Sequence, residues 1–580
     1  MKLLAVEEGP NGTRGNLADL YLKKVEGTGN VYVATSPLTR IDTQISARYA
    51  KDVACETIDH DCISDFLYTI KAKSNLIGGP SAGAAIAILT IAELEKLELD
   101  EKVAITGTIN SGGLIGPVGS LIKKIEAAKE GNITTVLIAK GSRYAENSSK
   151  QEKEIEIMDI INITTDNSID LVDFGKELNI SVIEVSRLEE ALSYFTHQTY
   201  EPETVELEID PEYEDTMLML ANSLCNRSQL LKEVIIDKGK IEGNEEIIES
   251  ATNATEQAFK FIDNKNYYSA ASFCFNANVR YRTILYRDLE PRDFLDEAEE
   301  IAKVVLSGDN YQSTRNLQTY IIVKQRLSER DKLVDDAVEI FREYKVGRAT
   351  LEDAQDLLAF ARERLHSALA WSAFFKIGDK EDGISKEAMK DTCSKKLEEA
   401  QERFQYASIY YPIQQEETEK EIIRAMQDAE NSNYELCIAR ATKAKAESDV
   451  ILSVIGVKKE QLPIIIKEKL AVARNEIATQ SSFPIVAYSY YQYSKSLLEE
   501  ENYYSALLYA EYALEMSNLD VYFKKPGFKI KFHEEYIMRL LALAAGIGIG
   551  ISLFSLAYTI RHRKPKKTRK KPARKRSKRK

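Results

Sequence analysis

The first 200 residues alternate between short β-branched segments and stretches in which apolar residues recur every three or four positions. The first pattern is typical of strands and the second of helices. Their alternation predicts an α/β domain over residues 1–200. The expected strands cover 31–34, 66–72, 103–109 and 134–139, and the expected helices cover 42–54, 81–97 and 121–129.

Helical periodicity then continues over residues 216–525, after a Pro-bearing acidic linker at 201–215, and predicts an all-α domain. Three of its segments resemble one another, because each begins with Asn-Tyr and continues with small residues. They start at Asn266, Asn433 and Asn502. Such segments are similar to the second helices of tetratricopeptide-type hairpins, and an ordinary helical bundle with aromatic packing stripes is the equal alternative.

Residues 540–560 form an uncharged apolar stretch that is long enough to cross ~30 Å of hydrocarbon as a helix. A juxtamembrane segment, 526–539, precedes it, and a tail at 561–580 with 14 Lys and Arg residues follows it. Basic residues beside a span mark the cytoplasmic side. We therefore expect a single-pass membrane protein with an extracytoplasmic body and a cytoplasmic tail near anionic lipid head groups. Nucleic-acid binding is not expected, because no aromatic residue interleaves these cations.

The tail holds 14 of the 78 Lys and Arg residues, so the remainder is more acidic than the net charge of −13 indicates. An exported body needs an N-terminal export signal with an apolar segment. In this sequence Glu7 and Glu8 occur before any such segment. We expect that a signal was removed from this numbering; a tail-anchored chain of opposite orientation is the alternative. Seven N-x-S/T sequons favour a glycosylated exterior. They begin at Asn11, Asn132, Asn147, Asn162, Asn179, Asn226 and Asn253.

Six cysteines are too few for a scaffold built on disulfides. We expect a disulfide between Cys55 and Cys62, with a reduced pair nearly as plausible. No metal or other cofactor is expected, because the cluster around this pair lacks a matched second pair of ligands; it comprises Cys55, Asp59, His60, Asp61 and Cys62. The remaining cysteines are expected to be buried apolar side chains of helices: Cys225, Cys274, Cys393 and Cys437.

A glycine turn with the sequence GGPSAG, at residues 78–83, leads into the helix expected at 81–97. The unpaired amides of a helix start, together with the glycine amides, can stabilise negative charge near the Ser81 hydroxyl. This arrangement suits a nucleophile. By itself it also describes an ordinary capped helix start.

A lysine, Lys124, follows 43 residues after Ser81, at the end of the sequence TGTINSGGLIGPVGSLIKK. The turn, the Thr-Gly strand, the Gly-x-x-x-Pro-x-Gly loop and the lysine together resemble the proteolytic domain of Lon-family serine proteases. The resemblance covers roughly residues 25–195 and is continuous from Ser81 to Gly141. It implies a Ser-Lys dyad, and it is closest to archaeal membrane-anchored Lon-like proteases that lack an ATPase domain.

By this resemblance Ser81 is the nucleophile, Lys124 is the general base, and Thr106 hydrogen-bonds the lysine. Gly79, Pro80 and Ala82 of the turn support the site. Helical register favours Lys124 over its neighbour Lys123. Three residues depart from the family pattern: Gly78 replaces an Asp found in many Lon enzymes, Thr108 replaces a frequent Glu, and Ser120 replaces a Gly.

The dyad requires a neutral Lys124, so burial must lower its pKa from ~10.4. The apolar residues expected to desolvate it are Ile105, Leu114, Ile115 and Ile122. We also expect the strand at 66–72 to pair with an extended substrate. No phosphate-binding G-x-x-x-x-G-K-[ST] loop occurs in the sequence, so cleavage should be independent of ATP.

The sequence therefore predicts a Lon-type α/β proteolytic domain, an all-α domain and one C-terminal transmembrane helix. The predicted function is an ATP-independent serine endopeptidase that cuts unfolded or exposed polypeptide segments. Its Lon relatives imply a possible homo-oligomer. The alternative is a non-catalytic or self-processing surface scaffold whose helical domain binds partner proteins. An intact Ser81, Thr106 and Lys124 argues against the non-catalytic form, because a scaffold has no physical need for that trio.

Overall fold

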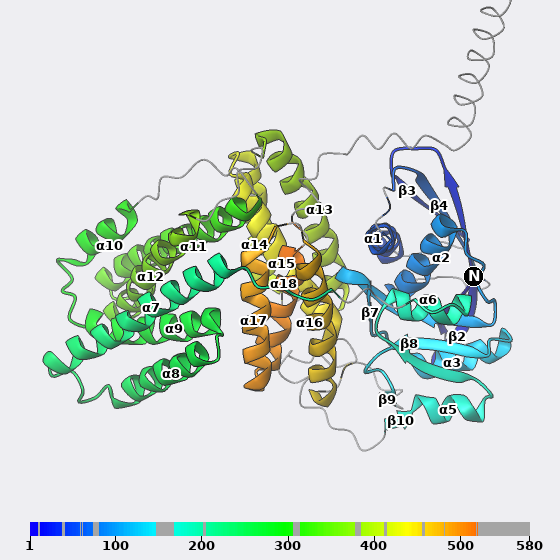
Figure 1. Ribbon diagram of the computed structural model, residues 1–580, viewed down its shortest axis with the longest axis horizontal. Coiled ribbons are helices and arrows are strands. Elements are labelled where there is room, and N and C mark those ends of the chain that lie inside the picture. Colours follow the sequence, from blue (N-terminus) through cyan, green and yellow to red (C-terminus); the bar gives the residue numbers. More distant parts are fainter. Residues whose placement is uncertain are drawn as a thin grey trace, which may run out of the picture. The chain divides into compact units, whose positions relative to one another are not determined.

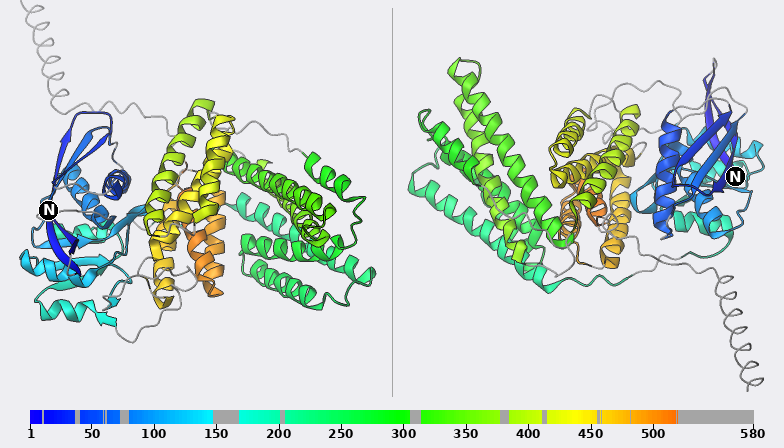
Figure 2. Two further views of the ribbon diagram at one scale, coloured as in Figure 1. Left: turned by 180° about the vertical axis from the view of Figure 1, so that it is seen from behind. Right: turned by 90° about the horizontal axis from the view of Figure 1, so that it is seen from above.

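The computed structural model describes residues 1–9, 12–36, 41–58, 60, 62–72, 80–146, 168–200, 205–304, 314–376, 384–410, 415–454, 457, 459–480, 482–517 and 519. Met1–Phe523 form one compact unit, and every described residue belongs to it. Strands and helices alternate in the described residues up to 200, whereas the described residues from 205 onward are mainly helical (Figures 1 and 2).

A mixed four-stranded sheet opens the fold. Its strands β1 (Lys2–Gly9), β2 (Gly12–Val25), β3 (Val31–Ser36) and β4 (Asp65–Ala72) lie in the order β1-β2-β4-β3. Strand β4 pairs antiparallel with β2 and parallel with β3. A parallel pair needs a crossover connection, which contains helix α1 (Ile41–Thr57). Alternate residues of β4, namely Phe66, Tyr68 and Ile70, are fully buried, as the period of a strand requires.

A three-stranded parallel sheet follows, formed by β5 (Val103–Thr106), β8 (Thr135–Ala139) and β11 (Ser181–Val185) in the order β11-β8-β5. Helices cover both of its faces, as is usual for parallel sheets. On one face Ile105 packs with residues of α2 (Gly83–Glu95) and α6 (Leu188–Thr196). On the other face Ala104 packs with residues of α3 (Leu121–Glu130) and α5 (Leu171–Glu177).

Two short antiparallel pairs complete this half. Strands β6 (Thr108–Asn110) and β7 (Leu114–Gly116) pair around the 3-10 turn η2 (Ser111–Gly113). Strands β9 (Tyr144–Glu146) and β10 (Ser168–Asp170) form the second pair.

The seven strands and helices expected in the first 200 residues are present, with two differences. The segment expected as one strand at 103–109 is divided at Gly107 into β5 and β6. The expectation that Ser81 opens a helix is wrong, because Ser81 lies in a single 3-10 turn, η1 (Pro80–Ala82), and α2 begins at Gly83. The Ser81 carbonyl accepts a hydrogen bond from the Gly107 N–H instead of one from within α2.

Helices fill the second half of the unit, as the sequence predicts. The first of them begins at Pro211, where the Asp210 carboxylate caps two backbone N–H groups. These helices are α7 (Pro211–Asp237), α8 (Glu245–Asp263), α9 (Tyr267–Tyr286), α10 (Phe294–Lys303), α11 (Thr314–Lys345), α12 (Leu351–Trp371), η3 (Ser372–Lys376), α13 (Lys386–Tyr410), α14 (Glu416–Glu430), α15 (Tyr434–Val454), η5 (Lys459–Gln461), α16 (Leu462–Thr479), α17 (Ile485–Glu499) and α18 (Tyr503–Ser517).

The three Asn-Tyr segments each provide the second helix of a hairpin: α8 with α9, α14 with α15, and α17 with α18. In each turn the residue before the Asn has a positive φ: Lys265 (60°), Ser432 (62°) and Glu501 (60°). The Asn N–H then donates to the carbonyl five positions earlier, at 2.8, 2.8 and 2.9 Å for Asn266, Asn433 and Asn502. The similarity that is visible in the sequence therefore reflects a shared turn between paired helices.

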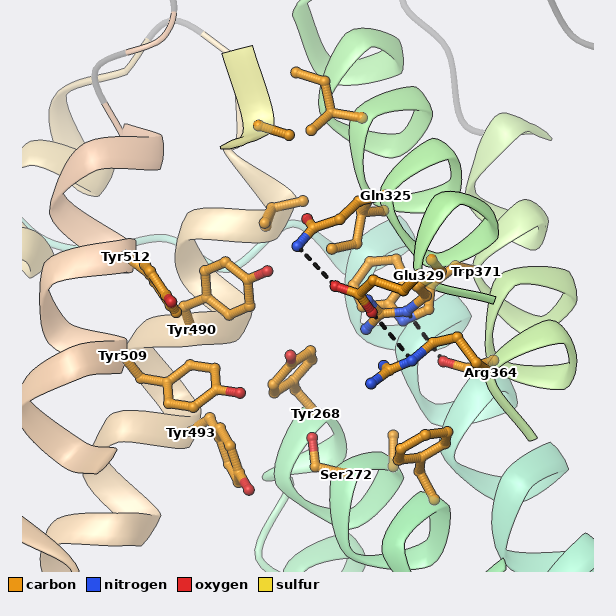
Figure 3. Close-up of a pocket in the computed structure, with 18 of the residues that line it drawn as sticks. Tyr268, Ser272, Gln325, Glu329, Arg364, Trp371, Tyr490, Tyr493, Tyr509 and Tyr512 are labelled. Carbon is orange, nitrogen blue, oxygen red and sulfur yellow. Dashed lines mark hydrogen bonds and ion pairs between the residues drawn. The ribbon is translucent and has the colours of Figure 1, made fainter. Parts of the chain in front are cut away.

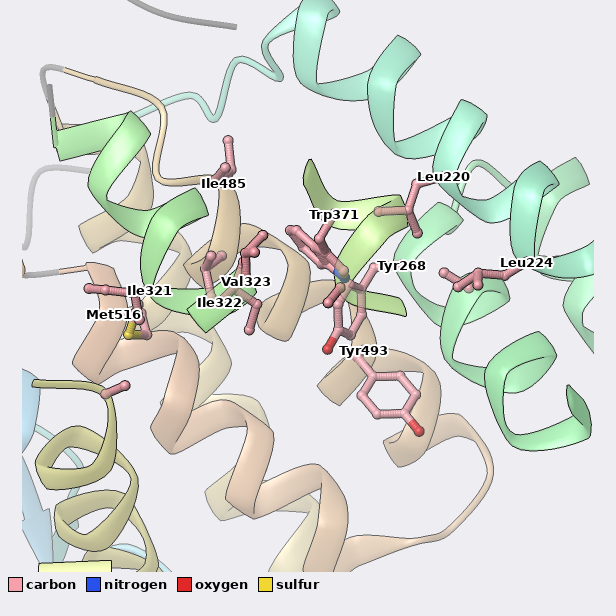
Figure 4. Packing of buried hydrophobic residues seen from close by; sticks show 14 of the residues in the cluster. Leu220, Leu224, Tyr268, Ile321, Ile322, Val323, Trp371, Ile485, Tyr493 and Met516 are labelled. Atoms are coloured by element: carbon pink, nitrogen blue, oxygen red, sulfur yellow. The ribbon is translucent and has the colours of Figure 1, made fainter. Parts of the chain in front are cut away.

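Aromatic side chains form much of the helical core. The single tryptophan, Trp371, is buried, and its ring centroid lies 6.0 Å from that of Tyr268 and 5.2 Å from that of Phe374. Ile321 and Ile322 of α11 belong to the same cluster (Figure 4). Much of the tyrosine content of the chain thus serves packing between helices.

Disulfides join all six cysteines in pairs. The bridge expected between Cys55 and Cys62 is present. The other four cysteines were expected only as buried apolar side chains of helices, and they are also bonded: Cys225 in α7 bonds to Cys274 in α9, and Cys393 in α13 bonds to Cys437 in α15. They are buried as expected, but they lie on neighbouring helices, a proximity that sequence spacing does not reveal.

Replacing Cys225 and Cys274 together with Ala should lower the free energy of unfolding by about 2–5 kcal/mol, because the bridge closes a long loop in the unfolded chain. The two cysteines are 49 positions apart, whereas Cys55 and Cys62 are only 7 apart, so the double Ala variant of the shorter bridge should lose less. Urea unfolding under oxidising and reducing conditions measures both effects. A wild-type protein equally stable with and without reductant would contradict this prediction.

Among the described residues, no helix combines the length and the apolar character needed to cross a membrane. The span expected at 540–560, the juxtamembrane segment and the basic tail lie outside the described residues.

Candidate functional site

The site is built where α3 packs on the parallel sheet. Apolar side chains recur along α3 at Leu121, Ile125 and Ala128, which places them on one buried face. Lys124 falls on that face and is only 3% exposed, whereas Lys123 lies at the surface and pairs with Glu126 at 3.0 Å. Helical register therefore carries one of two adjacent lysines into the interior.

A buried threonine meets this lysine. Thr106 lies two residues after Ala104, so it faces α3 from the end of β5. The Lys124 ammonium Nζ donates to Thr106 Oγ1 at 3.1 Å, which is the contact the sequence resemblance implies. Burial without a nearby carboxylate lowers the pKa of Lys124 to about 7. A large fraction of this amine is therefore neutral at physiological pH and can accept a proton.

The residue after Thr106 links the lysine to the serine turn. The Gly107 N–H donates to the Ser81 carbonyl at 3.1 Å, and the Gly107 carbonyl accepts from the Ala84 N–H at 3.1 Å. The Thr106-Gly107 dipeptide thus contacts Lys124 through the Thr106 side chain and the Ser81 turn through the Gly107 backbone. Ser81 itself is partly exposed. Ala82 and Pro80 lie in the same turn, while Gly78 and Gly79 lie outside the described residues.

Two glycines allow these elements to approach one another closely. A Cβ atom at Gly83 would press against Ser46 of α1 and the backbone of Ile109. A Cβ atom at Gly107 would collide with the Ile115 side chain. Glycine at both positions therefore lets the start of α2 rest closely against β6 and β7, and a side chain at position 107 would displace Ile115.

The departures from the family pattern have structural consequences. Ser120 caps α3 with a φ of 59°, a conformation that favours glycine, so a side chain there carries backbone strain. Thr108 is buried, and its hydroxyl has no hydrogen-bond partner among the described residues. Of the four residues expected to desolvate Lys124, only Ile122 packs against the cluster that contains the buried face of α3. Ile105 and Ile115 instead belong to the cluster that contains α2 and α6, and Leu114 packs with Val472 and Leu514 of the helical region.

The expectation that the strand at 66–72 pairs with substrate is wrong. Strand β4 is an interior strand, because β2 covers one of its edges and β3 covers the other along nearly its whole length. Both rows of its backbone hydrogen-bonding groups are thus used within the sheet. A substrate strand needs an unpaired edge.

Sequence reasoning missed an arginine of the helical region. Arg403 in α13 is 3% exposed, and its guanidinium donates to the Ile109 carbonyl of β6 at 3.0 Å. The same guanidinium lies 3.5 Å from the centroid of the Tyr49 ring and pairs with Asp449 at 2.8 Å. No local signal could reveal this contact, because 294 positions separate Arg403 from Ile109.

Comparison with known proteins finds a family match over this part of the chain. Residues 73–172 match the Lon protease (S16) C-terminal proteolytic domain, and that range contains Ser81, Thr106 and Lys124. The chain therefore carries a Lon-type proteolytic domain, followed by a mostly helical region.

Individual proteins to which this chain is similar are also Lon proteases. Lon protease 2 of Bacillus subtilis is 38% identical over 89 residues, which are 15% of this chain and 15% of that protein. The archaeal Lon protease of Methanothermobacter thermautotrophicus is 33% identical over 110 residues, 18% of this chain and 16% of that protein. That of Pyrococcus abyssi is 29% identical over 147 residues, 25% of this chain and 14% of that protein. The chain thus spans about a sixth of the length of these relatives.

Replacing Lys124 with Met should raise the free energy of unfolding at pH 7 by about 3 kcal/mol. The pKa of Lys124 is lower in the folded state, so the unfolded chain holds more protons between pH 7 and about 10.5, and the wild-type protein gains stability as pH rises through that interval. Met removes the cost of the buried amine. Urea unfolding at pH 7 and pH 10 tests this: the gain should shrink at pH 10, and a Met variant less stable at both values would contradict it.

Proposed function

We propose that this chain is an ATP-independent serine endopeptidase whose nucleophile is Ser81 and whose general base is Lys124. The observation that carries the proposal is the buried Lys124, whose pKa is lowered to about 7 and whose amine bonds to Thr106 beside the serine turn. The other buried lysines of the described chain, Lys396, Lys445 and Lys469, each pair with a glutamate, whereas burial acts on Lys124 without a carboxylate. The matched Lon-type domain also supports a serine peptidase.

In the proposed reaction the neutral Lys124 amine removes the proton from the Ser81 hydroxyl as its oxygen attacks a peptide carbonyl. The tetrahedral intermediate then collapses: the C–N bond breaks, and the lysine returns the proton to the departing amine. This leaves an ester on Ser81. A water molecule, deprotonated by the same lysine, hydrolyses the ester and restores the free hydroxyl.

The proposed substrates are polypeptide segments that are already unfolded or exposed. The sequence contains no phosphate-binding loop of the G-x-x-x-x-G-K-[ST] type that an attached ATPase would need to drive unfolding. The names of the relatives identify them as Lon proteases. Assembly of this chain into a homo-oligomer is proposed from that likeness.

We also propose that residues 540–560 anchor the chain in a membrane, with the body outside the cytoplasm and the tail at 561–580 near anionic lipids. Three disulfides support this location, because such bonds persist in oxidising compartments. The four sequon asparagines whose exposure the structure describes are all exposed: Asn132, Asn179, Asn226 and Asn253.

The pH dependence of cleavage tests the proposed base. With the full chain in detergent, no nucleotide and an unfolded fluorescent polypeptide, kcat/KM should rise with pH and reach half of its maximum near pH 7, where Lys124 loses its proton. Addition of ATP should leave the rate unchanged. A midpoint near that of an ordinary lysine, or no cleavage at any pH, would refute the proposal.

A further inference from the structure

A cavity of about 330 Å³ lies within the helical region, between α9, α11 and α12 on one side and α17 and α18 on the other (Figure 3). Its lining runs from Leu224 to Met516, so no residue of the Lon-type domain contributes to it. The volume lies at the lower end of the range for small-ligand pockets. It suits one or two amino-acid residues or a small organic molecule.

One wall of the cavity is aromatic and rich in hydroxyl groups. Tyr490 and Tyr493 of α17 pack edge-on against Tyr509 of α18, with centroids 5.4 and 4.6 Å apart. In Figure 3 the hydroxyls of Tyr490 and Tyr509 point toward the opposite wall. Among the described residues, none forms a hydrogen bond with the hydroxyls of these three tyrosines. Burial raises all three pKa values, so each hydroxyl keeps its proton and can donate.

The opposite wall carries two arginines held against aromatic rings. The Arg326 guanidinium lies 5.2 Å from the Trp371 ring centroid, and the Arg364 guanidinium lies 5.2 Å from that of Phe360. Their planes are thereby held in place by stacking. Among the described residues that line the cavity, Glu329 is the one carboxylate; it pairs with Arg364 at 3.1 Å and accepts from the Gln325 side-chain amide at 3.2 Å. One carboxylate therefore faces two guanidinium groups.

The cavity thus offers guanidinium and phenol hydrogen-bond donors in an aromatic setting with excess positive charge. A ligand that matches it brings an acceptor-rich anion joined to a flat apolar group. A planar carboxylate fits the fork of a guanidinium, and tyrosine rings accept an aromatic side chain.

We propose that this cavity binds a carboxylate carried beside an aromatic ring, presented by an aromatic C-terminal residue of a polypeptide. A free small aromatic acid has the same chemistry and is the other source of such a group. The role that we assign to this cavity, recruitment of chain ends, rests on the proposed peptidase function. Binding itself requires no cleavage.

The test uses the full chain in detergent with the background substitution Ser81→Ala, so that binding is measured without cleavage. The probe is a fluorescein-labelled Ala-Ala-Phe peptide with a free C-terminal carboxylate, compared by anisotropy with its C-terminal amide. The amide should bind at least about tenfold more weakly, because a charged hydrogen bond is lost. Arg364→Gln should weaken binding of the carboxylate by a similar factor.

A second variant keeps the test decisive if the Arg364→Gln chain does not fold. Tyr509→Phe keeps the ring and removes only the hydroxyl, so it should weaken binding severalfold, whereas Tyr504→Phe, on the exposed side of α18, should leave it unchanged. Competition by N-acetylphenylalanine separates the two sources of the carboxylate. Potency equal to that of the unlabelled peptide identifies a free acid, and much weaker potency identifies a chain end. Equal affinity for peptide and amide, unchanged affinity in both Arg364→Gln and Tyr509→Phe, or no binding at millimolar peptide would overturn the proposal. Binding in a chain whose wild type cleaves nothing would leave it standing while the peptidase proposal fails.

Discussion

Replacing Ser81 with Ala should lower kcat for cleavage of an unfolded polypeptide by roughly 10⁴- to 10⁶-fold, as in enzymes that depend on an activated serine. The side chain is partly exposed and lies in a single 3-10 turn, so its removal should change stability by less than about 0.5 kcal/mol. KM should change little, because the hydroxyl acts in the chemical step. Steady-state rates and urea unfolding on the same preparations measure both quantities.

Two lysine variants complete this experiment. Lys124→Met should lose activity by a similar factor while gaining stability at pH 7, so that its inactivity cannot be attributed to misfolding. Lys123→Met is the matched control, since Lys123 lies at the surface and pairs only with Glu126 among the described residues. It should retain near-wild-type rates. If Ser81→Ala cleaved as fast as the wild-type chain, the nucleophile would be another group.

Helical register favoured Lys124 over Lys123 from the sequence alone, whereas the contact between Lys124 and Thr106 was implied by the resemblance to Lon-family proteases. The structure gives both a local cause. The spacing of Leu121, Ile125 and Ala128 determines which lysine of α3 is buried, and strand alternation directs Thr106 toward it. Such periodicities are properties of one helix and one strand, so a single sequence suffices to read them. The same reasoning failed for β4, because which strands flank it is decided by topology and not by its own residues.

Contacts between distant segments were beyond prediction for the same reason. Cys225 and Cys274 read as apolar helical residues until α7 and α9 are seen to be neighbours. The tyrosines of α17 and α18 read as packing residues, although several of them line a cavity. Helical periodicity states which face of a helix is buried, and it does not state what lies opposite that face.

Replacing Arg403 with Met should lower the free energy of unfolding by about 3–5 kcal/mol, because it leaves the buried Asp449 carboxylate without its ion pair. The same change removes the donor to the Ile109 carbonyl, in the strand that follows Thr106 and Gly107. A small displacement of that strand moves the partner of Lys124. We therefore expect kcat to fall by about tenfold or more even at temperatures where the variant is folded.

Two comparisons identify the cause of these losses. Arg48→Met breaks the exposed pair with Glu402, the neighbour of Arg403, and should cost no more than about 1 kcal/mol. Adding Asp449→Asn to Arg403→Met removes the unpaired charge, so it should restore part of the stability but not the rate, because the Ile109 carbonyl still lacks its donor. Full recovery of kcat in the double variant would mean that Arg403 acts through stability alone. If instead the rate stays low, the helical region helps to position the strand beside the proposed base, and the two halves of the unit work as one enzyme.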